Sequence, residues 1–319
     1  MAVYTSVSDA ALEAFLTRYD IGPAVSLKGI AEGVENSNFL LETTRGRYIL
    51  TLFEKRVSPE DLPYFLSLMT HCADAGLPVA PAIAQKDGSF LGELCGRPTA
   101  VIAFLKGLSV DDPSPVHCAA VGHALADLHQ ATSSFKMDRP NTLSLEGWID
   151  LAAQTADGAD RCEPGLGQLI ADEIGYLQQH WPIDLPIGVT HSDLFPDNVL
   201  FTGSKITGII DFYFSATDFL AYDLAVLVNA WCFDFNHQLD RKRAKAIIET
   251  YDTARPLTAA ETLAMPILMR GAALRFMLTR LYDWLNQQAD ALVKVKDPLD
   301  YKIRLHQHRA LKDLADYVV

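Results

Sequence analysis

Short apolar runs separated by turn residues fill the first hundred residues and indicate β-structure. The runs "NFLLET" and "RYILTLFE" flank Thr44, Arg45 and Gly46, which predicts a β-hairpin over residues 38–54. In the same way, "SFLGEL" and "PTAVIAFL" flank "CGR" and predict a second hairpin over residues 89–105. The first part of the chain is therefore expected to form mostly antiparallel sheet.

Two helical stretches accompany these strands. The segment "SVSDAALEAFLTRYDIG" has the apolar spacing of a short amphipathic helix that ends near Gly22. Between the hairpins, Ser58 as N-cap and Pro59 at the first helical position begin a helix, and Gly76 ends it. Sheet and helix together predict a compact N-terminal lobe.

From residue 111 onward, helical periodicity dominates in four stretches: "PVHCAAVGHALADLHQAT", "GLGQLIADEIGYLQQHW", "DLAVLVNAWCF" and "MPILMRGAALRFMLTRLYDWLNQQ". The exception is "NVLFTGSKITGIIDF", where Gly203 to Lys205 can turn one short strand into the next, so that Asn198 and Asp211 converge. We predict an α+β chain with a β-rich antiparallel lobe over residues 1–103 and a larger, mainly helical lobe over residues 104–319.

Composition narrows the class of partner. With 319 residues, 49% of them hydrophobic and 21% charged, the chain has the make-up of an ordinary folded protein. A formal net charge of −13 argues against nucleic acid and against an anionic membrane surface as partners, and favours small ligands. Five cysteines without a C-x-x-C pair, and no long apolar run, predict buried thiols in a reducing cytoplasm and no membrane span.

The histidines give no zinc pattern. His123 and His129 lie six residues apart in a predicted helix, a spacing that does not put two metal ligands on one face. His306 and His308, two apart in a C-terminal helix, are predicted to lie at the surface.

The densest group of polar residues is "VTHSDLFPDNVLF", which contains His191, Asp193 and Asn198, with Asp211 thirteen residues further on. Carboxylates this close repel one another unless a cation or a shared proton holds them. The order H-x-D-x-x-x-x-N, followed by a hairpin and an Asp-Phe pair, matches the catalytic loop of protein kinases. Such a set suits phosphoryl transfer, which needs a carboxylate at the acceptor hydroxyl and oxygen ligands for Mg²⁺.

These residues resemble the aminoglycoside phosphotransferase and choline kinase superfamily, a protein-kinase-like fold for small molecules. Within it, the chain looks most like the bacterial homoserine kinase branch, through "GIAEGVENSNFLLET", "RYILTLFE", "GLPVAPAI", "ITGIIDFYFSATDFLAYDLAVLVNAWCFD" and "LRFMLTRLYDW". The resemblance runs through most of the chain and implies ATP and Mg²⁺ as cofactors and a small hydroxylated acceptor.

The resemblance also implies roles for single residues. Asp193 is expected to act as the base at the acceptor hydroxyl, and Asn198 and Asp211 to bind Mg²⁺. His191 is expected to hold the loop rather than to carry a proton, and Asp223 to tether the loop from a helix start. For Asp193, Asn198 and Asp211, the alternative is a plain turn-capping role.

The expected nucleotide lobe departs from the kinase pattern. Gly29 and Gly33 are followed by "VENSN" instead of completing G-x-G-x-x-G, so a phosphate-binding loop using Gly33 and Asn36 competes with a simple β-turn. The segment around Ala103 to Leu105 is expected to meet adenine.

The lysine that kinases place on the third strand is also missing. Its position is Thr51, and Lys55 lies on the same face of an extended strand, two pleats further along. Lys55 is therefore the candidate phosphate clamp; the alternative is a solvated lysine at the end of the strand.

An amino-acid acceptor presents a carboxylate, which guanidinium groups bind well. Arg275 and Arg280 on the last long apolar stretch are the candidates, with a salt bridge inside the helical lobe as the alternative. Asn38 and Trp231 complete the candidate substrate residues, although most aromatic residues at helical spacing belong to a core.

Three hypotheses follow. The first is a kinase that phosphorylates the hydroxyl of L-homoserine in threonine biosynthesis. The second is a kinase of the same fold for choline, methylthioribose or an aminoglycoside. The third is a catalytically silent ATP-binding relative, prompted by the missing strand lysine.

Overall fold

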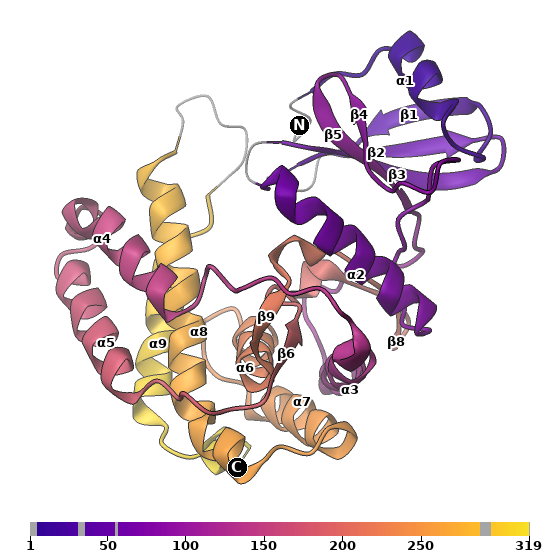
Figure 1. Cartoon of the computed structure of the whole chain (residues 1–319). Helices are drawn as coiled ribbons and strands as arrows, with labels where there is room; N and C mark the ends of the chain where they lie inside the picture. Colours follow the sequence, from indigo (N-terminus) through magenta and orange to yellow (C-terminus); the bar gives the residue numbers. More distant parts are fainter. Residues whose placement is uncertain (1–4, 31–35, 55–56, 288–294, 319) are drawn as a thin grey trace.

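We describe a computed structural model of the chain over residues 5–30, 36–54, 57–287 and 295–318. The protein has two lobes, a small sheet lobe and a larger helical lobe, with helix α2 (Leu62–Asp74) between them (Figure 1). The predicted α+β, kinase-like architecture is confirmed. Strand β5 ends at Ala103, at the predicted boundary between the lobes; that boundary stays a prediction.

The sheet lobe contains one antiparallel sheet in the order β1-β2-β3-β5-β4. Both predicted hairpins are present, because β2 pairs with β3 and β4 pairs with β5. The bounds are β1 (Ala24–Gly29), β2 (Asn36–Thr43), β3 (Gly46–Phe53), β4 (Gly92–Leu94) and β5 (Arg97–Ala103).

Alternation along β3 divides its side chains between two cores. Leu50 and Leu52 face α1 (Asp9–Leu16) and close the smaller core on the outer side of the sheet. Phe53 belongs to the large core, which α2 shares with the helical lobe. Thr51 is on the same face as Phe53, toward the junction of the lobes.

Two helix predictions differ in detail from the structure. Helix α1 ends at Leu16, six residues before Gly22, because Thr17 to Gly22 turn toward the sheet. The helix predicted from Ser58 begins as a 3₁₀ turn over Pro59–Asp61. The Ser58 hydroxyl bonds the Glu60 carboxylate instead of capping the helix.

In the helical lobe, the structure describes the helices α3 (Pro115–Ala131), α4 (Leu145–Cys162), α5 (Leu166–His180), α6 (Leu220–Trp231), α7 (Arg241–Ala254), α8 (Ala259–Leu285) and α9 (Leu299–Ala310). Its strands are β6 (Ile187–Thr190), β7 (Val199–Thr202), β8 (Lys205–Ile209) and β9 (Ala216–Phe219). The prediction for His308 was wrong: this residue of α9 is fully buried, and its ring contacts the Asn229 side chain and the Tyr317 hydroxyl, both at 3.0 Å.

Two small antiparallel strand pairs lie next to the segments that carry His191, Asp193, Asn198 and Asp211. The predicted hairpin is confirmed as β7 and β8, which turn at Gly203 with a φ of 61°. Strand β6 pairs with β9, so the loop after β6 and the segment before β9 lie next to each other. The Ile210 amide then donates to the Asn198 carbonyl at 3.0 Å, which brings Asn198 and Asp211 together as predicted.

Candidate active site

Asp223, in the first turn of α6, holds the backbone of the loop from His191 to Asn198, the candidate catalytic loop. The Asp223 carboxylate accepts the His191 amide at 2.7 Å and the Ser192 amide at 2.8 Å. Burial alone would raise the pKa of Asp223, but the hydrogen bond and charge of His129 and the amide donors together lower it. Asp223 is therefore an ionised, buried carboxylate that holds the backbone of the loop.

His191 connects the two acidic segments. Its Nε2 lies 3.1 Å from the carbonyl of Ile210, the residue before Asp211, and its Nδ1 accepts the Asp193 amide at 3.3 Å. Burial lowers the pKa of His191 to about 4, so the ring is neutral and carries its hydrogen on Nε2. These contacts join the loop to the segment before Asp211 through a neutral ring.

Asp193 and Asn198 face each other inside the loop. The Asn198 Nδ2 donates to the Asp193 carbonyl at 2.8 Å and to Asp193 Oδ2 at 3.3 Å. Because the amide nitrogen is used within the loop, Oδ1 is the atom of Asn198 that can bind a cation. Burial is the largest influence on Asp193 and raises its pKa to about 6, against the opposing effect of Arg275.

Asp211 lies between β8 and the 3₁₀ turn Phe212–Phe214, with left-handed backbone angles of φ 65° and ψ 61°. This conformation is uncommon for a residue with a side chain and is often found at functional sites. The Ile210–Asn198 hydrogen bond places the backbone of Asp211 beside Asn198. A carboxylate and an amide oxygen are ligands that suit Mg²⁺.

Arg275 and Trp231 support the loop from the helical lobe. The Arg275 guanidinium, from α8, is 2% exposed and donates to the Ser192 carbonyl at 2.5 Å. The indole of Trp231, from α6, is fully buried and donates to the Leu194 carbonyl at 2.7 Å. Arg275 and Trp231, two of the four candidate substrate residues, thus contact the backbone of the loop. Trp231 is fully buried and exposes no surface to a ligand.

Arg280 lies away from this group. Its guanidinium donates to the Asp297 carbonyl and to Asp300 Oδ2, each at 2.9 Å, and stacks over the Tyr301 ring. These contacts are the salt bridge within the helical lobe that the sequence left as the alternative.

On the sheet, the nucleotide candidate Asn36, the substrate candidate Asn38 and Thr51 all bond to residues on or next to a neighbouring strand. The Thr51 hydroxyl donates to Asn38 Oδ1 at 2.8 Å, and Asn36 Oδ1 accepts the Glu54 amide at 3.3 Å. Gly33 and Lys55 lie outside the described residues. Within the described residues, neither of these two asparagine side chains makes a hydrogen bond to the loop from His191 to Asn198.

The predicted hinge lies at the junction of the two lobes. The Ala103 amide donates to the Pro81 carbonyl at 3.0 Å. Leu105 is partly buried in the large core, and its side chain lies beside Gly208 of β8.

Sequence reasoning missed His129 and Tyr251. His129, from α3, contacts Asp223 Oδ2 through Nε2 at 3.1 Å, and its Nδ1 contacts the Tyr251 hydroxyl at 2.8 Å. The network therefore extends from the catalytic loop through α6 and α3 to α7. A polar residue on the apolar stripe of α3 was the available signal, but it does not name its partner.

Arg139, in the segment between α3 and α4, was also missed. Its Nε donates to Asp61 at 2.8 Å and its Nη1 to the Ser215 carbonyl at 3.1 Å, while the guanidinium stacks over the Phe65 ring. Arg139 thereby links the start of α2 to the segment that follows Asp211.

The fold and this site define a phosphotransferase of the protein-kinase-like class. Solved structures with this fold include an amicoumacin kinase in complex with AMP-PNP and Ca²⁺, with a TM-score of 0.70, 15% identity and 96% coverage of both chains. A choline kinase from Cryptosporidium parvum has a TM-score of 0.64 and 16% identity over 89% of this chain and 88% of its own. At such low identity, these likenesses concern the fold.

Residues 26–257 match the model of the phosphotransferase enzyme family. The homoserine kinase of Methylobacterium radiotolerans is 55% identical over 99% of both chains, and that of Bradyrhizobium sp. ORS 278 is 54% identical over 99% of this chain and 98% of its own. The chain belongs to this phosphotransferase family and to its homoserine kinase branch, and it is an ATP-dependent enzyme. Across the described part of the chain, no helix is both long enough and apolar enough to cross a membrane.

Proposed function

We propose that this enzyme transfers the γ-phosphate of ATP to the side-chain hydroxyl of L-homoserine. The observation that carries the proposal is identity of 52–55% to homoserine kinases along almost the whole chain. It is supported by the convergence of Asp193, Asn198 and Asp211 at one end of the β7–β8 hairpin. The product would be the phosphate ester used for threonine biosynthesis.

Asp193 is the proposed base. The acceptor oxygen attacks the γ-phosphorus, the bond to the bridging oxygen of ADP breaks, and the hydroxyl proton passes to the Asp193 carboxylate. A base works best when its pKa is near the working pH, and burial has already moved the pKa of Asp193 upward to about 6. The Asn198 donor holds the carboxylate in one orientation.

Mg²⁺ is the proposed metal, with Asn198 Oδ1 and the Asp211 carboxylate as its protein ligands. When bound, it would neutralise phosphate charge. The donor set fits, because hard cations prefer oxygen ligands and one carboxylate plus one amide leaves positions for phosphate oxygens and water.

We assign Arg275 a positioning role. A guanidinium that is 2% exposed and bonded to the Ser192 carbonyl acts on substrate through the loop, by fixing the backbone next to Asp193. It also lowers the pKa of Asp193 against the larger effect of burial.

We also propose that the enzyme works in the cytoplasm. All five cysteines are free thiols, and those at positions 72, 118 and 232 are buried. The prediction of buried thiols was wrong for Cys95, which is exposed in the turn between β4 and β5. Burial raises the pKa of the Cys72 thiol to about 12, which keeps it protonated and unreactive.

The test is release of ADP from Mg·ATP with L-homoserine, L-serine, choline, 5-methylthioribose or kanamycin, and without acceptor. Strong stimulation by L-homoserine alone is expected. Stimulation by another acceptor would keep the reaction type and replace the substrate. No stimulation by any acceptor, in a protein that still binds ATP, would contradict the proposal. An Asp193→Asn enzyme run in parallel separates turnover at this site from a contaminating kinase.

A further inference from the structure

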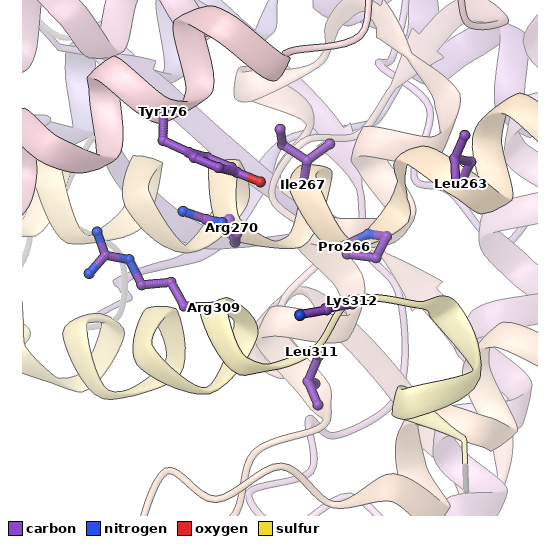
Figure 2. Close-up of a pocket in the computed structure, with 8 residues that line it drawn as sticks. All are labelled: Tyr176, Leu263, Pro266, Ile267, Arg270, Arg309, Leu311 and Lys312. Atoms are coloured by element: carbon purple, nitrogen blue, oxygen red, sulfur yellow. The ribbon is translucent and has the colours of Figure 1, made fainter.

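A pocket with a volume of about 270 Å³ lies between α5, α8, the last turn of α9 and the residues that follow it (Figure 2). Its lining residues are Tyr176, Leu263, Pro266, Ile267, Arg270, Arg309, Leu311 and Lys312. Arg270 precedes Arg275 by five residues on α8, which is a rotation of about 140° around the helix axis. The pocket is thus on a different face of α8 from the catalytic loop.

Positive charge at this pocket exceeds the negative charge that it must balance. Glu173 is fully buried, and its carboxylate accepts Arg270 through Nε at 2.7 Å and Nη2 at 2.9 Å. The same carboxylate accepts the Nε of Arg309 at 2.7 Å. One carboxylate therefore faces two guanidinium groups, whose remaining N–H donors make no further hydrogen bond within the part of the chain that the structure describes.

Lys312 adds a third cation. Figure 2 shows its side chain pointing into the space between α8 and α9. Its ammonium makes no ion pair or hydrogen bond within the described ranges of the chain. The carboxylate of Asp316 accepts the backbone amides of Lys312 and Asp313 and also interacts with the Lys312 charge. Three cations, against the carboxylates of Glu173 and Asp316, form a local exception to the net charge of −13 of the whole protein.

The rest of the pocket is apolar. Pro266, Ile267 and Leu311 form part of its wall, and the Tyr176 ring stacks on the Arg270 guanidinium with 3.7 Å between the ring centre and Cζ. This stacking holds Arg270 in place while one face of the pocket stays non-polar. Convergent charged donors beside an apolar wall are the usual design of a small-ligand site.

We infer that this pocket binds a small organic anion. Its carboxylate or phosphate group would contact Lys312 and the free N–H donors of Arg309, and its short apolar part would pack on Pro266 and Ile267. The site is separate from the catalytic loop, and the inference is independent of which acceptor the enzyme phosphorylates.

The experiment is calorimetric titration of the full chain with butyrate, propylphosphonate, inorganic phosphate and 1-butanol at constant ionic strength. Saturable binding of butyrate or propylphosphonate, without binding of 1-butanol, is expected. Butyrate and propylphosphonate distinguish a carboxylate ligand from a phosphate-like one. Inorganic phosphate reports on the anionic group alone.

Lys312→Met tests whether the binding is at this pocket. Lys312 is exposed, so the variant should fold, and loss of one charged contact should weaken the binding about tenfold. Lys245→Met, on the exposed surface of α7, is the matched control and should bind like the wild type. Absence of saturable binding by both organic anions, or equal affinity in wild type and Lys312→Met, would overturn the inference.

Discussion

The catalytic loop and the sheet lobe use polar side chains in opposite ways. Around the loop, Asp223, His191 and Arg275 bond to backbone atoms, so the chain itself is fixed and the Asp193 carboxylate is directed by its surroundings. On the sheet, Thr51 and Asn38 bond to each other across two strands. The first arrangement orients the proposed base, whereas the second engages Thr51, at the position where kinases place their strand lysine, with a neighbouring strand.

This difference predicts how strongly substitutions in the two regions affect turnover. Preorganised polar groups stabilise a transition state without reorganisation at the moment of reaction, and the loop has this character. On the described sheet, position 51 carries a hydroxyl that bonds Asn38, in place of the lysine ammonium that kinases have there. We therefore expect changes at the loop to affect turnover strongly and changes at Thr51 to affect it little.

Asp193→Asn is expected to have the largest effect. Loss of the base should lower kcat on the order of a thousandfold, with ATP binding retained. Because burial raises the folded-state pKa of Asp193 to about 6, its ionised form disfavours folding above that pH, so the variant should also have a higher Tm at about pH 8. Steady-state ADP release and thermal unfolding measure both effects.

Asp197→Asn is the matched control for this variant. Asp197 is exposed, with a carboxylate 3.7 Å from the Lys296 ammonium. It should keep kcat within about twofold of the wild type. A wild-type rate in Asp193→Asn would remove Asp193 from its assigned role.

Asp211→Ala should lower kcat/KM on the order of a hundredfold, because one of the two proposed Mg²⁺ ligands is lost. The KM for Mg·ATP should rise, and a higher Mg²⁺ concentration should restore part of the activity. Titration of the rate with Mg²⁺ at fixed ATP is the measurement. An unchanged Mg²⁺ dependence would argue against Asp211 as a ligand.

Asp223→Asn should damage the support of the loop. The variant loses a charge that two backbone amides and His129 compensate, so the free energy of unfolding should fall by about 3 kcal/mol. Displacement of the loop should lower kcat on the order of tenfold or more in the folded enzyme.

Glu173→Gln is the control for stability alone in this comparison, because Glu173 is a buried carboxylate elsewhere in the same lobe. It should lower Tm without changing kcat. Equal rates in the two variants would mean that Asp223 stabilises the fold and does not position the loop.

The pH profile gives a smaller, graded effect. Asp193 accepts a proton only when ionised, so kcat/KM should fall as the pH drops below about 6 and be about tenfold lower at about pH 5 than on the plateau. Bound metal favours the ionised form, so the inflection of kcat should lie at lower pH. A kcat/KM profile that stays flat down to about pH 5 would contradict the effect of burial on Asp193.

The sequence predicts the residues of the loop and its hairpin, but not the residues that only tertiary packing brings to them. His191, Asp193, Asn198 and Asp211 were predictable because short spacings and one hairpin bring them together. His129, Tyr251 and Arg139 were not, since their partners are distant in sequence and only the packing of α3, α6 and α7 brings His129 to Asp223. Trp231 and Arg280 were candidates from residue type alone, and burial and a local ion pair account for their contacts.

Thr51→Val is expected to have the smallest effect and sharpens the comparison most. The substitution keeps the shape of a buried side chain and removes the hydrogen bond to Asn38, which should cost about 1 kcal/mol of stability. If Thr51 serves the sheet alone, the KM for ATP should stay within about twofold of the wild type. A tenfold rise in that KM with unchanged Tm would instead make the Thr51 hydroxyl a phosphate contact, and the sheet lobe would then share the preorganised character of the catalytic loop.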